Sequence, residues 1–125
     1  MEVNRLAKEI VDSAIEVHRH LGPGLLESAY ESSLCHELSI RGLPFARQVS
    51  LPVTYKGQRL ASGYRLDMVV GDALAVELKA VDRLEPIHTA QLLTYLKLSD
   101  YRLGLLLNFN VRLMKDGIKR VANGM

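Results

Sequence analysis

The sequence has a single cysteine, Cys35, and this scarcity excludes a disulfide within the chain. It also lacks Cys and His clusters at metal-ligand spacing, which excludes a zinc or iron–sulfur signature. No apolar run approaches the length needed to cross a bilayer. The net charge is only +2, from 16 Lys and Arg against 14 Asp and Glu, so overall electrostatics do not indicate a nucleic-acid partner.

The first residues are charged from Glu2 onward and lack the apolar block of a signal peptide. We therefore expect a cytoplasmic protein with no membrane association. A chain of 125 residues, 48% hydrophobic and 24% charged, is typical of one soluble globular domain. Internal repeats, low-complexity tracts and linkers are absent, so residues 1–125 should form a single domain.

The periodicity of the apolar residues predicts an α/β protein. Apolar residues recur three, four and seven positions apart in the expected helices, and short turns separate the expected strands. The expected helices are 3–21, 25–41 and 86 to about 98; the expected strands are 45–55, 59–70, 73–80 and 103–109, followed by a short tail.

The register of the hairpin formed by strands 59–70 and 73–80 decides which side chains share a face. A two-residue turn at Gly71-Asp72 would mix charged and apolar residues on both faces. A three-residue turn, 71–73, instead pairs Asp67 with Glu77 and sorts a continuous apolar set, Tyr64 to Leu78, onto the opposite face. We prefer this second register because it buries the apolar set.

The preferred register has an electrostatic consequence. Two carboxylates that face each other across a strand pair repel, unless a cation neutralises them. Mg²⁺ binds to one or two carboxylates and keeps several waters, so Asp67 and Glu77 could hold it, with Lys79 beside them on the same face. The alternative is a solvated face on which Arg65 and Lys79 pair with the two carboxylates.

Two helices contribute polar residues to this picture. Glu27 projects between Leu34 and Leu38 on an apolar stripe and lacks a basic residue at helical spacing, which carries a desolvation cost. The alternative is a glutamate favoured at a helix start by the helix dipole. His88, Gln91 and Tyr95 share a stripe of the last helix, and the amide and phenol are good donors to a phosphate or a water. The alternative is an exposed helix face, which we favour for His88 alone.

Several segments resemble a known family. The stretch Gly24-Leu25-Leu26-Glu27-Ser28-Ala29-Tyr30 resembles the signature of the GxxExxY protein family, a branch of the PD-(D/E)XK nuclease superfamily, and GYRLD, VELKA, QLLTYLKL and LGLLLNFN are similar to it as well. The resemblance spans about residues 5–121. It implies a restriction-endonuclease-like α/β core with a mixed, largely antiparallel sheet flanked by helices.

The resemblance also implies a set of site residues. Asp67 matches the aspartate of the second core strand, and Glu77-Leu78-Lys79 matches the (D/E)XK triplet, with Leu66 where the superfamily's name has proline. Asp67, Glu77 and the Leu78 carbonyl would hold Mg²⁺ or Mn²⁺. Lys79 would position the attacking water.

The helices would complete this site. Glu27 matches the first-helix glutamate and would join the metal directly or through a water. Gln91 and Tyr95 resemble the QxxxY element of RecB-like nucleases, and would position phosphate or complete the hydrogen bonding of Glu27.

We therefore expect a metal-dependent nuclease that hydrolyses phosphodiester bonds in DNA. The alternative is a nuclease-fold binding or regulatory module that does not cut nucleic acid. A homodimer is expected as the simplest way to meet two strands of a duplex. Phosphate binding would need a basic patch, for which the candidates are Arg47, Arg59, Arg65, Arg83 and Arg102.

Overall fold

The computed structural model describes residues 1–124, with residues 61 and 62 described by their main chain alone. The elements, in chain order, are α1 (Val3–Leu21), α2 (Glu27–Ile40), β1 (Phe45–Tyr55), β2 (Gln58–Val70), β3 (Leu74–Lys79), α3 (Pro86–Ser99), β4 (Leu103–Asn108), the 3₁₀ turn η1 (Met114–Gly117) and β5 (Ile118–Ala122).

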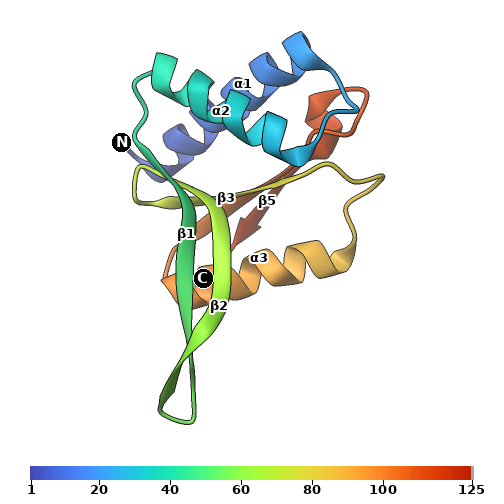
Figure 1. Cartoon of the computed structure of the whole chain (residues 1–125). Coiled ribbons are helices and arrows are strands. Elements are labelled where there is room, and N and C mark those ends of the chain that lie inside the picture. The colour runs from blue at the N-terminus through green and yellow to red at the C-terminus, as the bar shows by residue number, and fades with distance from the viewer. Residues whose placement is uncertain (125) are drawn as a thin grey trace.

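The five strands form one sheet in the order β1-β2-β3-β4-β5. All neighbours are antiparallel except β3 and β4, which are parallel and are joined through α3. Helices α1 and α2 cover one face, and α3 covers the other (Figure 1). The expected α/β architecture, a mixed and largely antiparallel sheet flanked by helices, is confirmed.

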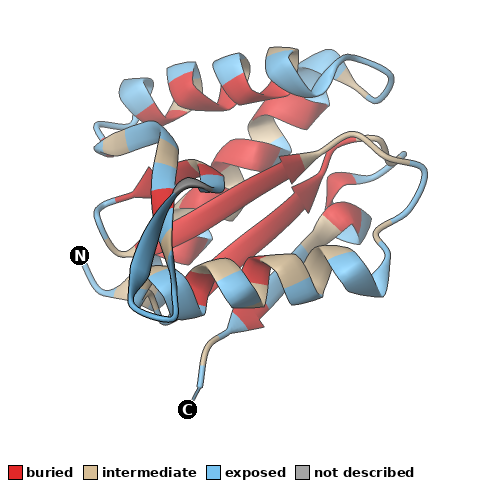
Figure 2. Cartoon of the chain, turned by 60° about the horizontal axis from the view of Figure 1, so that its bottom comes forward, coloured by how far each residue is buried: buried red, intermediate tan, exposed pale blue. Residues whose placement is uncertain are grey.

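The parallel pair lies at the centre of the molecule. Every residue of β4 is buried, and in β3 only Lys79 is partly exposed (Figure 2). A strand covered on both faces needs apolar side chains on both, which explains why β4 reads as a continuous apolar run. The charged residue Glu77 therefore stands within the most deeply buried part of the sheet.

Helix α1 packs against the sheet through Leu6, Ile10, Ala14 and Val17, which its periodicity places on one stripe. The Glu2 side chain caps its start by accepting a hydrogen bond from the Arg5 N–H, at 3.0 Å. No helix among the described residues combines the length and the apolar content that crossing a bilayer requires.

The tail expected after residue 109 is wrong, because residues 118–122 form β5 and pair with β4. The single apolar face expected for the hairpin is also wrong in part. Met68 packs under α1 and α2, whereas Leu66 belongs to the cluster under α3, and the Tyr64 ring lies 5.0 Å from that of Tyr95 on α3. The strand therefore changes its facing between Leu66 and Met68.

Candidate functional site

The turn between β2 and β3 sets the register at the candidate site. The ladder pairs Val70 with Leu74 and Met68 with Val76, so the turn has three residues, 71–73. This confirms the preferred register over the two-residue turn. The next step along the ladder brings Asp67 and Glu77 opposite each other.

At that step, hydrogen bonds from main-chain N–H groups to the two carboxylates replace the main-chain ladder between β2 and β3. The Asp67 N–H donates to Glu77 Oε1 at 2.8 Å, and the Leu78 N–H donates to Asp67 Oδ2 at 2.8 Å. Each carboxylate thus uses one oxygen to hold the neighbouring strand and retains a second oxygen. Hydrogen bonds to the charged form are the main stabilising contacts that the protein offers these two groups.

The strand on the other side also leaves Asp67 without a ladder partner. The β1–β2 pairing runs from Arg47 opposite Met68 to Val49 opposite Leu66, and omits Gln48. Gln48 has φ 50, a left-handed conformation that interrupts a strand. The β1 ladder therefore skips Asp67 and the β3 ladder ends at Met68, so the Asp67 main chain has no ladder partner on either side.

The electrostatics of the pair are unfavourable without a cation. Glu77 is only 6% exposed, and burial, followed by repulsion from Asp67, raises its pKa to about 8. Burial likewise raises the pKa of Asp67, against the lowering effects of the Leu78 N–H and Lys79. Among the described residues, no Lys or Arg lies within ion-pair distance of either carboxylate.

Glu27 is the first residue of α2 and faces the same region. Its side chain is exposed, yet partial desolvation and then the negative charge of Asp67 raise its pKa, while Lys79 lowers it. Among the described residues, no three His, Cys, Asp or Glu side chains converge closely enough to hold a metal by themselves. The structure therefore brings Asp67 and Glu77 together, with Glu27 nearby rather than in one three-carboxylate set.

The loop before α2 positions Glu27. Gly24 has φ 100, which favours glycine. The Tyr30 hydroxyl donates to the Gly22 carbonyl at 2.5 Å and accepts from the Leu25 N–H at 3.1 Å, while its ring stacks on Phe109 at 4.6 Å. The glycine, glutamate and tyrosine that resemble the family signature thus act together: Gly24 shapes the turn, Glu27 follows it, and Tyr30 anchors it.

A buried carboxylate that the sequence analysis missed lies one turn further along α2. Glu31 is 7% exposed; its Oε2 accepts from Arg47 Nη2 at 2.8 Å, and its Oε1 from Gln48 Nε2 at 2.9 Å. These contacts hold the left-handed residue of β1 opposite Asp67. The available signal was the spacing of Glu27 and Glu31, four residues apart on one helix face. Arg47, expected in a basic patch, pairs with Glu31 instead.

The two residues that follow Glu77 differ in environment. The Leu78 side chain is buried, and its N–H points toward Asp67, so its carbonyl points to the same side of the strand. Lys79 is partly exposed and lowers the pKa values of Glu27, Asp67 and Glu77. A cationic group therefore faces the carboxylates without forming a close ion pair.

Helix α3 brings Tyr95 to the same region. Burial raises the pKa of Tyr95, followed by the negative charge of Glu77. Gln91 and Tyr95 line a shallow hollow together with Tyr64. His88, on the same stripe, instead accepts a hydrogen bond from the Glu85 N–H and completes a capping box at the start of α3, which is a structural role.

The residues present fit a hard divalent cation. Two oppositely placed carboxylates with raised pKa values gain most from a positive charge between them. Mg²⁺ needs only one or two carboxylates, a carbonyl and waters, so it does not require three carboxylates to converge. Asp67, Glu77 and the Leu78 carbonyl supply such oxygens on two adjacent strands.

The α/β core thus places two carboxylates opposite each other on adjacent strands, with a lysine two residues after the second. The sequence profile of the PD-(D/E)XK nuclease superfamily matches residues 4–121, nearly the whole chain. The chain belongs to the PD-(D/E)XK nuclease superfamily. Searches of the curated proteins and of the solved structures each return no significant match.

Proposed function

We propose that this protein is a metal-dependent nuclease that hydrolyses phosphodiester bonds in DNA. One observation carries the proposal: in a chain of a nuclease superfamily, Asp67 and Glu77 oppose each other at a break in the sheet with no close cationic partner among the described residues. A sheet that needed the pair only for stability would do better with apolar residues or an ion pair.

The carboxylates and one carbonyl would hold the cation. The second oxygens of Asp67 and Glu77, with the Leu78 carbonyl, would bind Mg²⁺ or Mn²⁺, and Glu27 would add a contact through a water. When bound, the ion would polarise the scissile phosphate and stabilise charge on the leaving oxygen.

The remaining residues would act on water and phosphate. Lys79 would orient the attacking water and stabilise negative charge that develops on the phosphate. Tyr95 would donate a hydrogen bond to a phosphate oxygen, and its raised pKa keeps the phenol protonated for this role. Gln91, which lines the same hollow, would position the phosphate or complete the hydrogen bonding of Glu27.

The direct test is cutting of linear, nicked, branched and single-stranded DNA with Mg²⁺ or Mn²⁺. We expect the wild type to cut at least one of these DNAs, and Asp67→Asn and Lys79→Met to be inactive. The control is Asp116→Asn, which removes an exposed carboxylate on η1 and should cut like the wild type.

Parallel purification of all four proteins identifies contaminating nuclease, because a contaminant would cut equally in each. If the folded wild type cuts no DNA with either ion, the proposal is wrong, and the result would favour a binding or regulatory module on the same fold.

A further inference from the structure

The net positive charge of the molecule lies on one projecting element, although most basic residues lie elsewhere. Residues 49–66 of β1 and β2, here called the arm, contain Lys56, Arg59 and Arg65 and no Asp or Glu. The whole chain has 16 Lys and Arg against 14 Asp and Glu, so removing the arm's three leaves 13 against 14. The overall charge of +2 therefore conceals a positive arm on a nearly neutral body.

The arm is anchored at its base and free at its tip. Leu51 and Leu66 are buried against α3, whereas Tyr55 at the tip is 61% exposed. Figure 1 shows the arm extending away from the helices, and Figure 2 shows that it is largely exposed. A two-stranded ribbon that buries little of its own surface gains no stability from its length, which suggests a binding role.

A kink interrupts the regular pairing of the arm. The β1–β2 register shifts between Leu51 and Val53, and a Cβ at Gly63 would lie 2.0 Å from the Leu51 carbonyl oxygen. Only glycine allows so close an approach of the two main chains. A hollow forms at this kink, lined by Ser50, Leu51, Pro52, Arg59, Leu60, Gly63, Tyr64 and Arg65.

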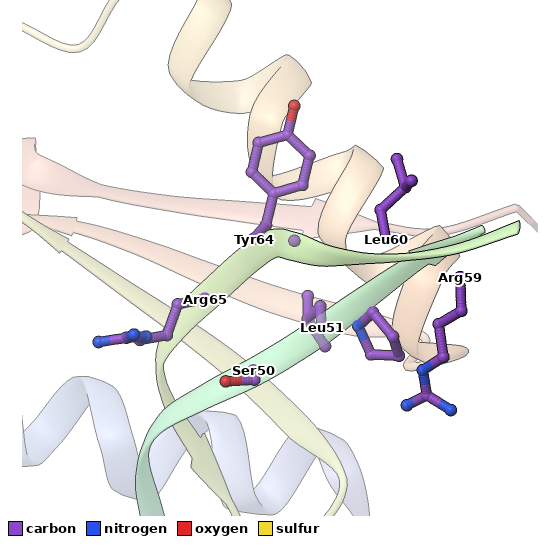
Figure 3. Close-up of a pocket in the computed structure, with 8 residues that line it drawn as sticks. Ser50, Leu51, Arg59, Leu60, Tyr64 and Arg65 are labelled. Atoms are coloured by element: carbon purple, nitrogen blue, oxygen red, sulfur yellow. The ribbon is translucent and has the colours of Figure 1, made fainter. Parts of the chain in front are cut away.

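The two arginines of this hollow are not neutralised by the protein. Figure 3 shows Tyr64 and Leu60 on one side of the strand, and Arg59 and Arg65 directed away from them. Among the described residues, neither guanidinium has a carboxylate within ion-pair distance, whereas Arg47 nearby is paired with Glu31. Free guanidinium groups bind phosphate oxygens in a planar, two-point geometry.

The hollow and the candidate site share strand β2. Arg65 and Asp67 are two residues apart on β2, ~7 Å along the strand. A chain of phosphates that follows the arm from Arg59 to Arg65 would thus reach the opposed carboxylates. Tyr64 lines this hollow and also the one formed by Gln91 and Tyr95 of α3, whose ring it contacts.

We propose that the kinked arm is the substrate-binding surface, and that Arg59 and Arg65 bind backbone phosphates of the nucleic acid on the way to the site at Asp67 and Glu77. This inference rests on the proposed nuclease function. It concerns phosphate contacts rather than base readout, so binding should depend strongly on salt and weakly on sequence.

The test measures binding separately from cutting. Labelled single-stranded and duplex DNA are titrated with the Asp67→Asn protein in EDTA, and anisotropy is read at several salt concentrations. Arg59→Gln with Arg65→Gln should reduce the magnitude of the slope of log K against log salt by about 1.8 for duplex and about 1.4 for single strands, if each arginine neutralises one phosphate. The control pair, Arg5→Gln with Arg112→Gln, removes the same charge from exposed positions outside the arm.

The outcomes separate the two proposals. A salt slope reduced by these amounts in the arm pair but not in the control pair, with equal melting curves, would support the arm as the binding surface. Equal slopes in the arm and control pairs would overturn it, even if the wild type cuts DNA. Lys56→Gln at the turn gives a second variant should the pair fold poorly, and a slope equal to the parent protein's there would also count against the arm. The single-stranded and duplex titrations identify which form supplies the phosphates.

Discussion

Glu31 and Glu77 are buried to nearly the same degree, 7% and 6% exposed, yet the protein treats them differently. Glu31 is met by the Arg47 guanidinium and the Gln48 amide. Glu77 is met by the Asp67 N–H and, across the strand, by a second carboxylate. One carboxylate is neutralised within the fold, and the other has no Lys or Arg within ion-pair distance among the described residues.

The difference indicates a division of labour within the site. Glu31 holds the left-handed Gln48, the residue at which the β1 ladder skips Asp67. Glu77 lies opposite Asp67 with a raised pKa, which is an unfavourable arrangement for the metal-free protein. Functional sites are the places where such local costs are expected, because the ligand removes them.

The largest effect should follow from removing the charge of Glu77. Glu77→Gln keeps an oxygen that can accept from the Asp67 N–H, but cannot bind a cation as a carboxylate. We expect cutting to fall by about a hundredfold or more, the usual size for loss of an electrostatic contact in an active site. Steady-state cutting assays measure this loss, and stability at neutral pH should not decrease. Unchanged cutting by Glu77→Gln would show that Glu77 has no role in catalysis that distinguishes it from Glu31.

The raised pKa of Glu77 should also make the stability of the protein depend on pH. In metal-free protein, folded Glu77 holds its proton up to pH about 8, whereas the unfolded chain releases it near the ordinary value of 4.5. The unfolded state therefore binds fewer protons in this interval, and the free energy of unfolding should fall as pH rises, by on the order of a few kcal/mol.

The measurement is urea unfolding in EDTA at pH 5.5 and 7.5. Both pH values lie between the ordinary pKa of Glu77, 4.5, and its raised pKa of about 8. Glu77→Gln removes the titration, so its stability should vary less between the two pH values than that of the wild type. A wild-type stability that rises over this interval would contradict the account.

Glu31→Gln should lower the free energy of unfolding, whereas Glu77→Gln should not. It removes the charge that faces Arg47 and weakens the contact to Gln48. Because Arg47 is itself half-exposed, we expect a loss of only about 1–2 kcal/mol in the free energy of unfolding. Urea unfolding at neutral pH measures it, with Glu77→Gln as the matched variant. Equal destabilisation by Glu31→Gln and Glu77→Gln would show that both carboxylates stabilise the fold in the same way.

The smallest effect is expected at the anchor of the loop before α2. Tyr30→Phe keeps the stacking on Phe109 and loses the hydrogen bonds to Gly22 and Leu25. Water can replace these bonds at the exposed loop, so we expect about 1 kcal/mol of lost stability. A looser Glu27 should also reduce cutting a few-fold. Unchanged cutting would show that the tyrosine serves the fold alone.

The hairpin at the site could be predicted because alternation of side chains is a local rule. Burying Met68, Val70, Leu74 and Val76 together requires the three-residue turn, and that turn places Asp67 opposite Glu77. The change of facing at Leu66 could not be predicted in the same way. It coincides with the left-handed conformation of Gln48 on the neighbouring strand, whose side chain is held by Glu31 of α2.

Other features were hidden for related physical reasons. The partner of Glu31 lies 16 residues away on another element, so no helical spacing reveals it. Strand β5 has only Val121 fully buried, which leaves almost no alternation to detect. The positive charge of the arm was not apparent from the net charge of +2, which sums over the whole chain. The homodimer stays a prediction.

The most direct test of the central claim is calorimetric titration of Mg²⁺ and Mn²⁺ into the wild type and Glu77→Gln near neutral pH, in buffers of different ionisation enthalpy. The account predicts that the wild type binds the ion and releases a proton, because a cation between Asp67 and Glu77 lowers the raised pKa of Glu77. It predicts weak or no binding by Glu77→Gln. Equal binding by both proteins, or no binding by the folded wild type, would contradict a cation site at this pair.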